Sequence, residues 1–253
     1  MDANTASRGW RWEEPELTGR ARTHVVELAE PRCVLHREVV APWRALRAAA
    51  AAAGIDLVPG SSFRDFEHQR RIWNAKFRGE RALLDPEGRP LDAAALEPGA
   101  RVAAILHWSA LPGASRHHWG TEIDVIDAAV LAPGERPALL PSEYAPGGIF
   151  ARLGAWLDAH AGEHGFYRPY DVYRGGVQPE PWHLSYAPLA REAERRLTPD
   201  LLATALAGAD VEGREAVLAR LGEIHARYVQ GVAEPAEQVL LAARRFTPAA
   251  SSS

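Results

Sequence analysis

The chain has 253 residues, of which 47% are hydrophobic and 25% charged, an ordinary balance for a soluble globular protein that leaves no large part suited to disorder. Its formal net charge of −4 gives none of the strong basic character that favours nucleic acid or an anionic membrane. We therefore expect no nucleic-acid partner, and because no apolar run approaches the length of a membrane-crossing helix, we expect no membrane span.

A single cysteine, Cys33, excludes an intrachain disulfide framework, and we expect it to pack at the start of a helix. The first thirty residues hold no apolar stretch of secretory length. This predicts cytoplasmic residence, with periplasmic or extracellular residence as the alternative if a leader is missing. Nothing in the sequence indicates an oligomeric state.

The first part of the chain predicts an irregular arm over residues 1–30 and then alternating helices and strands. A helix is predicted to begin at Pro31, because proline suits a first helical turn, and to end at Gly54. Its buried face is marked by apolar residues at near-helical spacing: Leu35, Val39, Trp43 and Leu46. A short strand follows over 55–58, and a second helix over 65–77.

The middle of the chain predicts a surface excursion and then further helices and strands. Residues 78–99 are rich in Pro, Gly, Asp and Glu, which is typical of a lid or an insertion. Beyond it we expect a helix over 101–108, a strand over 121–126, a Pro/Gly-rich loop over 132–148, a helix over 149–160, and strands at 166–167 and 182–186.

The last part turns to Ala, Leu, Arg and Glu and predicts a helical extension. Thr198 and Asp210 are helix-start residues, and the second helix is expected to carry Val217, Leu221 and Ile224. An edge strand over 228–232 and a disordered tail over 251–253 complete the prediction. The fold class is α+β, a small antiparallel sheet flanked by helices, divided into an arm (1–30), a core (31–187) and a helical C-terminal extension (188–253).

Three residues carry the functional prediction. His117, Asp124 and His183 form a mixed imidazole and carboxylate set, which is what a catalytic Zn²⁺ site needs if it is to keep one position for water. Gly120 suits a tight turn that lets the backbone approach the metal. We expect one Zn²⁺ per chain.

Two further residues can act on a substrate at such a metal. Glu180, three positions before His183, can serve as general base and then as acid to a leaving amine, provided that Pro181 bends the chain toward the metal. Arg64 can pair with a substrate carboxylate or a developing oxyanion. Each also has a plain structural interpretation, Glu180 as a surface carboxylate and Arg64 as a partner of Asp65 or Glu67.

Other histidines offer alternatives for the metal. His160 and His164 are four apart, but the glycines around them weaken a helix there. His118 competes with His117, although adjacent side chains diverge. Trp119 and Trp182 are the tryptophans expected to border the site as substrate-binding residues.

These motifs together resemble the zinc D-alanyl-D-alanine carboxypeptidases and dipeptidases of the VanY and VanX type. The resemblance covers roughly residues 35–187. It is carried by three blocks: Ser61-Ser62-Phe63-Arg64 with Gln69, Ser115-x-His117-x-x-Gly120-x-x-x-Asp124, and Glu180-x-Trp182-His183.

The resemblance implies a Hedgehog/DD-peptidase-like fold, His117, Asp124 and His183 as zinc ligands, Glu180 as catalytic base and Arg64 as the arginine that stabilises the transition state. It also implies that Ser115 contacts the substrate or supports the motif, and that Gln69 supports the substrate-binding site. Glu122 departs from the small residue common in the family. As it shares a strand face with Asp124, it can support the ligands from behind.

The implied substrate is a D-amino-acid-containing peptide or peptidoglycan, cleaved at its C-terminal peptide bond. One alternative keeps the site and changes the bond, as an L,D-carboxypeptidase or an endopeptidase of the peptidoglycan stem. The alternative from another class is a zinc-containing module that binds cell-wall peptides without cleaving them.

Overall fold

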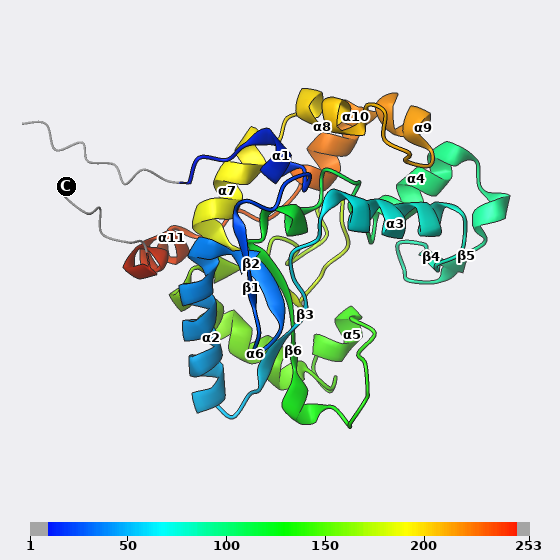
Figure 1. Ribbon diagram of the computed structural model, residues 1–253. Coiled ribbons are helices and arrows are strands. Elements are labelled where there is room, and N and C mark those ends of the chain that lie inside the picture. The colour runs from blue at the N-terminus through cyan, green and yellow to red at the C-terminus, as the bar shows by residue number, and fades with distance from the viewer. Residues whose placement is uncertain (1–9, 247–253) are drawn as a thin grey trace, which may run out of the picture.

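The computed structural model describes residues 10–246, which combine helices with small antiparallel sheets (Figure 1). This is the α+β class that the sequence predicts. The tail over 251–253, for which disorder is predicted, lies outside the described residues. Within the part that is described, no helix combines the length and apolar character needed to cross a membrane.

The central sheet has four antiparallel strands in the order β3-β6-β8-β7. Its strands are β3 (Leu57–Ser61), β6 (Glu122–Asp127), β7 (Phe166–Tyr167) and β8 (His183–Tyr186). Almost every side chain of β6 and β8 is buried, on both faces of the sheet. The two inner strands are therefore covered on both sides, and polar side chains on them must find partners inside the protein.

Three helices of the core lie within a few residues of the prediction: α3 (Phe66–Phe77), α4 (Pro98–Leu106) and α6 (Ala151–His160). Helix α2 (Val40–Ala52) begins later than predicted, and α5 (Pro141–Tyr144) is a short helix inside the segment predicted as a loop. Asp65 caps α3 by accepting a hydrogen bond from the His68 amide at 2.8 Å. The excursion over residues 78–99 contains a small hairpin, β4 (Leu83–Leu84) with β5 (Pro90–Leu91).

The N-terminal prediction is wrong in two respects. Residues 10–30 are structured, with α1 (Glu14–Leu17) and β1 (Val25–Leu28), and Trp12 is almost fully buried. The helix expected from Pro31 begins only at Val40, because residues 33–36 form strand β2 (Cys33–His36), which pairs with β1. Cys33 thus lies in a strand and not at a helix start.

The apolar residues of that predicted helix are nevertheless all in the core: Leu35, Val39, Trp43 and Leu46 are fully buried. Leu35 is buried from β2 and Trp43 from α2, so the near-helical spacing spans two different elements. Spacing alone could not separate them, because the backbone partners of β2 come from the preceding strand.

The C-terminal extension is helical. It comprises α7 (Ala187–Arg196), α8 (Pro199–Leu206), α9 (Arg214–Leu218), α10 (Leu221–Ile224), a π-helical turn η6 (His225–Val229) and α11 (Glu237–Ala243). The edge strand expected over 228–232 is wrong, since η6 and the loop after it occupy this region. Figure 1 shows α9 beside α4, and Trp73 on α3 donates to the Glu212 carbonyl at 2.9 Å.

Candidate active site

Three side chains able to bind a metal come from three elements and meet beside the central strands. His117 lies on a 3-10 turn, η3 (Arg116–Trp119), Asp124 on β6 and His183 at the start of β8. The sheet register places Asp124 directly opposite His183. One ligand atom of each residue lies within 4.8 Å of the others, and all three side chains are buried.

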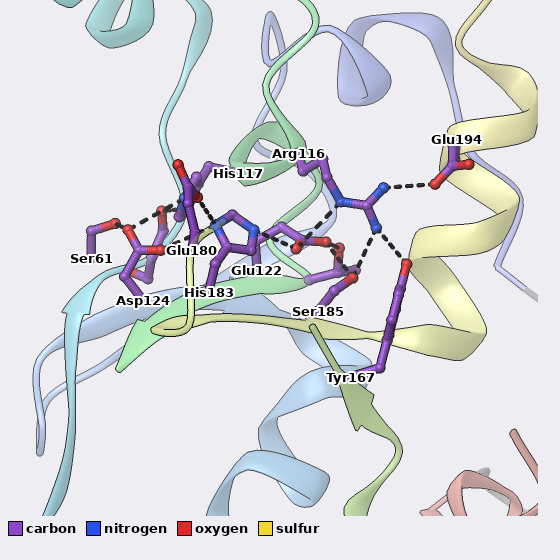
Figure 2. A network of polar contacts seen from close by, with 12 residues as sticks. Ser61, Arg116, His117, Glu122, Asp124, Tyr167, Glu180, His183, Ser185 and Glu194 are labelled. Carbon is purple, nitrogen blue, oxygen red and sulfur yellow. Dashed lines mark hydrogen bonds and ion pairs between the residues drawn. The ribbon is translucent and has the colours of Figure 1, made fainter. Parts of the chain in front are cut away.

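One nitrogen of each imidazole is hydrogen-bonded to a neighbouring protein group, and the other nitrogen faces Asp124. His117 Nδ1 donates to the Ser62 carbonyl at 2.8 Å, and His183 Nε2 donates to Glu122 Oε2 at 2.8 Å (Figure 2). The remaining nitrogens face the same carboxylate, with His117 Nε2 3.5 Å from Asp124 Oδ2 and His183 Nδ1 3.2 Å from Asp124 Oδ1. The protein thus fixes the orientation of both rings.

The free atoms fit a metal ion. Asp124 Oδ1 and His183 Nδ1 are buried and have no well-formed hydrogen bond. Leaving such an atom unsatisfied costs about 1–3 kcal/mol, a penalty that coordination of a cation would remove. Two nitrogens and one carboxylate oxygen are donors that suit Zn²⁺ and related divalent metals, with further positions open to water or substrate.

Burial and nearby charges hold two of the three candidate ligands, Asp124 and His117, in protonation states that can bind a metal. Burial opposes ionisation of Asp124, but His117, His183 and Arg64 hold its pKa well below the usual range. Burial, assisted by Arg64, lowers the pKa of His117 to about 3. Near neutral pH these residues are therefore a carboxylate and a neutral imidazole, the forms that bind metals.

His183 differs from His117. Although burial disfavours its charged form, the carboxylates of Asp124, Glu122 and Glu180 raise the pKa of His183 well above the usual value. Binding of a metal at its Nδ1 would therefore compete with protonation of the ring.

Gly120 closes the turn that carries His117. Its φ is +65°, and a Cβ there would lie 2.6 Å from the His36 amide nitrogen and from Val25 Cγ1. The tight turn was predicted, but the close approach is to the β1–β2 hairpin and not to the metal site. The His36 amide donates to the Gly120 carbonyl at 2.8 Å, which fastens the hairpin onto η3.

Glu180 reaches the same three ligands. The His183 amide donates to the Glu180 carbonyl at 3.1 Å, which closes a turn around Pro181, and Glu180 Oε2 lies 3.2 Å from His183 Nδ1. The bend that the sequence argument required is thus present. The carboxylate is mostly buried and faces the free edge of His183, as Figure 2 shows.

Arg64 lies beside Asp124 Oδ2, whereas His183 lies beside the other oxygen of this carboxylate, Oδ1. Its Nη1 donates to Gln69 Oε1 at 3.1 Å, and its Nη2 lies 3.6 Å from Asp124 Oδ2. Gln69 is fully buried and donates in turn to the Ala110 carbonyl at 2.8 Å. Arg64 therefore faces the metal ligands, whereas Asp65 caps α3, and Gln69 holds the guanidinium in place.

A small cavity of about 50 Å³ opens beside these groups. Its walls are Arg64, Trp108, Ser109, Ala110, Ser115, Arg116, His117, Tyr170, Val177, Glu180 and His183. Ser115 lines the cavity, as expected of a residue that contacts a substrate. The Trp108 Nε1 donates to the Asp85 carbonyl at 2.9 Å, which ties the 78–99 excursion to this wall.

Trp119 and Trp182 do not line the cavity, contrary to the sequence prediction. Trp119 is fully buried and donates from Nε1 to the Leu17 carbonyl at 3.1 Å. Trp182 is also buried and packs on Tyr144, with ring centroids 5.9 Å apart. Both indoles are therefore part of the core, whereas His117 and His183, close to them in the sequence, face the site.

The rival histidines lie elsewhere. His118 points away from the ligands, with Nδ1 bonded to the Arg64 carbonyl at 2.6 Å and Nε2 accepting from the Gly113 amide at 3.1 Å. His164 stacks on Phe246, and His160 pairs with Glu163. Among residues 10–246, the one group of three or more His, Cys, Asp or Glu side chains close enough to share an ion is His117, Asp124 and His183.

Two polar residues at the site were not singled out from the sequence. Ser61, opposite Asp124 in the β3–β6 register, donates to Asp124 Oδ2. Arg116, beside His117, is buried and pairs with Glu194 at 2.7 Å. Arginine side chains are usually exposed. The partner of Arg116, Glu194, is 78 positions away, so the local sequence gave no indication that Arg116 is buried.

Comparison with known proteins agrees with this geometry. A family model described as D-alanyl-D-alanine carboxypeptidase, VanY, matches residues 32–189. This match covers more than half of the chain and identifies its class, the peptidoglycan-peptide hydrolases. We conclude that the chain belongs to the VanY D-alanyl-D-alanine carboxypeptidase family.

The chain is also similar to a curated protein and to two solved structures. An uncharacterised protein of Haemophilus influenzae (strain ATCC 51907 / DSM 11121 / KW20 / Rd) is 36% identical over 121 residues, 47% of this chain and 92% of that protein. The structure of VanYB in complex with D-alanine-D-alanine is 21% identical, with a TM-score of 0.47 over 73% of this chain and 89% of that one. A Zn(II) complex of a mutant D,D-pentapeptidase VanY from a VanB-type resistance cassette is 22% identical, with a TM-score of 0.47 over 76% and 88% of the two chains.

Proposed function

We propose that this protein is a zinc-dependent D-alanyl-D-alanine carboxypeptidase or dipeptidase that hydrolyses the C-terminal peptide bond of peptidoglycan-type peptides. Membership of the VanY family supports the reaction class. The single observation that carries the proposal is the convergence of His117 Nε2, His183 Nδ1 and the Asp124 carboxylate beside Glu180, which lies 3.2 Å from His183.

In this proposal His117 Nε2, His183 Nδ1 and the Asp124 carboxylate hold one Zn²⁺. The ion, when bound, supplies a Lewis acid that polarises the scissile carbonyl and makes a water more acidic. Glu180 accepts the proton of the attacking water and then passes it to the departing amine. Arg64, held by Gln69, stabilises negative charge that develops on the carbonyl oxygen.

The lining of the cavity includes Arg64, a cation that can pair with the free carboxylate at the C-terminus of a substrate. This supports an exopeptidase over a stem endopeptidase. The position of Glu180 beside the ligands argues against a module that binds peptides without cleaving them.

Turnover by the zinc-loaded protein on three peptides tests the proposal. We expect release of D-alanine from D-Ala-D-Ala or from a stem pentapeptide ending in it. Cleavage restricted to a tetrapeptide would instead indicate an L,D-carboxypeptidase, and internal cleavage an endopeptidase. Recovery of all three peptides bound but uncut would contradict a hydrolytic function.

Glu180→Gln is the matched variant for the mechanism. It preserves the shape of the side chain and removes the proton acceptor, so we expect zinc to be retained and kcat to fall by roughly 10²–10⁴-fold. Metal content and kcat are measured on the same preparation. Undiminished kcat would remove Glu180 from the role of general base.

A further inference from the structure

A buried chain of polar contacts leads from the metal ligand His183 to the C-terminal extension (Figure 2). Glu122 accepts from His183 Nε2 at 2.8 Å, and its second oxygen accepts from Ser185 Oγ at 2.7 Å and Thr121 Oγ1 at 2.9 Å. The Glu122 side chain is fully buried. With donors on every side, it is satisfied only as a carboxylate.

The next member of the chain is Arg116. Its Nε lies 3.5 Å from Glu122 Oε2, and its Nη2 donates to Tyr167 Oη and Ser185 Oγ, each at 2.9 Å. The guanidinium has 2% of its surface exposed, so its charge is compensated by protein groups and not by water. It therefore links Glu122 to the far end of the network.

Glu194 is that far end. It accepts from Arg116 Nη1 at 2.7 Å and is mostly buried on helix α7. The family match ends at residue 189, so this carboxylate comes from the part of the chain beyond the match. Two carboxylates thus share one buried guanidinium, and only one of them also holds a metal ligand.

We propose that Glu122, Arg116 and Glu194 act as positioning residues that orient His183 for the metal, so that metal affinity depends on helix α7. Glu122 keeps the His183 proton on Nε2 and thereby turns Nδ1 toward the site. Glu194 shares the charge of Arg116, which leaves Glu122 free to hold the imidazole. Without Glu194, Glu122 is the one carboxylate left beside Arg116, which draws it from His183. The inference rests on the proposed metal site.

The test measures metal affinity without substrate, by competition of Zn²⁺ between the protein and a chelator. Glu122→Gln keeps the side-chain shape and removes the charge, and we expect about a 10-fold or greater loss of affinity. Glu194→Gln, which touches no ligand, should lose several-fold. The control is Glu192→Gln on the same helix, whose carboxylate pairs with Arg195 at the surface and should leave affinity unchanged.

A second readout separates orientation of the ligand from general loss of structure. The absorption spectrum of the Co²⁺-loaded protein should change in Glu122→Gln, because the ligand field at His183 changes, while the melting temperature of the metal-free variant stays near that of a folded protein. Wild-type affinity and an unchanged spectrum in both Glu122→Gln and Glu194→Gln would overturn the inference alone. Absence of metal binding by the wild-type protein would overturn the proposed function together with it.

Discussion

At the residue scale, each imidazole of the candidate site has one nitrogen hydrogen-bonded to the protein, while its other nitrogen faces the proposed metal position. The orienting groups differ, a backbone carbonyl for His117 and a carboxylate for His183. A carboxylate partner makes an imidazole a stronger ligand than a carbonyl does. His183 is therefore the ligand whose affinity the rest of the protein can adjust.

Arg64 depends on Gln69 for its orientation, and this gives a prediction at the same scale. Gln69→Ala removes the acceptor at 3.1 Å from the guanidinium and should lower kcat by about 10-fold while zinc content is unchanged. Glu67→Gln, on the exposed side of the same helix, is the control. Steady-state kinetics with metal analysis would contradict the assignment if both variants behaved alike.

The convergence of His117, Asp124 and His183 could be predicted from the sequence, where only six residues lie between His117 and Asp124 and strand alternation fixes the face on which Asp124 lies. Arg116 and Trp119 could not, since their burial is decided by Glu194 and Leu17, which are distant in sequence. A short motif does not show whether its remaining side chains point to the site or to the core.

At the element scale, the loop between β7 and β8 carries Glu180 and is held from outside the core. Arg227 donates through Nε and Nη2 to the Gly175 carbonyl at 2.9 and 2.7 Å, and a Cβ on Gly176 would meet the Arg227 carbonyl at 2.0 Å. The Ala233 amide donates to the Pro169 carbonyl at 2.8 Å. The π-helical turn η6 thus fixes one side of this loop.

We expect Arg227→Ala to free the loop and to lower kcat several-fold, because Glu180 would spend less time beside the ligands. Zinc affinity should not change. Arg220→Ala is the matched control, since Arg220 shares the partner Glu223 but has no contact with Gly175. Equal kinetics for the two variants would show that the loop needs no support from η6.

The β1–β2 hairpin and η6 are among the elements that the sequence prediction missed. Both occupy segments whose apolar spacing suits another structure, and both are stabilised by contacts with distant parts of the chain, such as His36 with Gly120 and Arg227 with Gly175. The four strands of the central sheet were predicted to within a few residues because apolar or alternating residues in them lie next to turn residues.

At the scale of the whole molecule, the N-terminal hairpin is attached to the site by buried histidines. His24 Nε2 donates to the His118 carbonyl at 2.9 Å, and the rings of His24 and His36 lie 5.8 Å apart against Trp12. Burial lowers the pKa of His36 to about 3, and it also lowers the pKa of His24. Both are therefore neutral in the folded protein near pH 7.

This burial predicts acid sensitivity. Between an unfolded pKa of about 6.5 and the folded value of about 3, the unfolded chain binds the proton of His36 and the folded chain does not, so stability falls as pH drops through that window. The limiting slope is about 1.4 kcal/mol per pH unit for one histidine. Urea unfolding of the metal-free protein at pH 7 and pH 5 should show a smaller difference for His36→Gln than for the wild type. His160→Gln, at an exposed site, should retain the full difference.

The metal content of the purified protein, after incubation with Zn²⁺ and removal of free metal, tests the proposed site most directly. We expect one Zn²⁺ per chain for the wild type and near-complete loss in His117→Ala and in Asp124→Ala, with Glu180→Gln still loaded. No tightly bound metal in the wild type, or one Zn²⁺ retained after either ligand is removed, would contradict the proposed site.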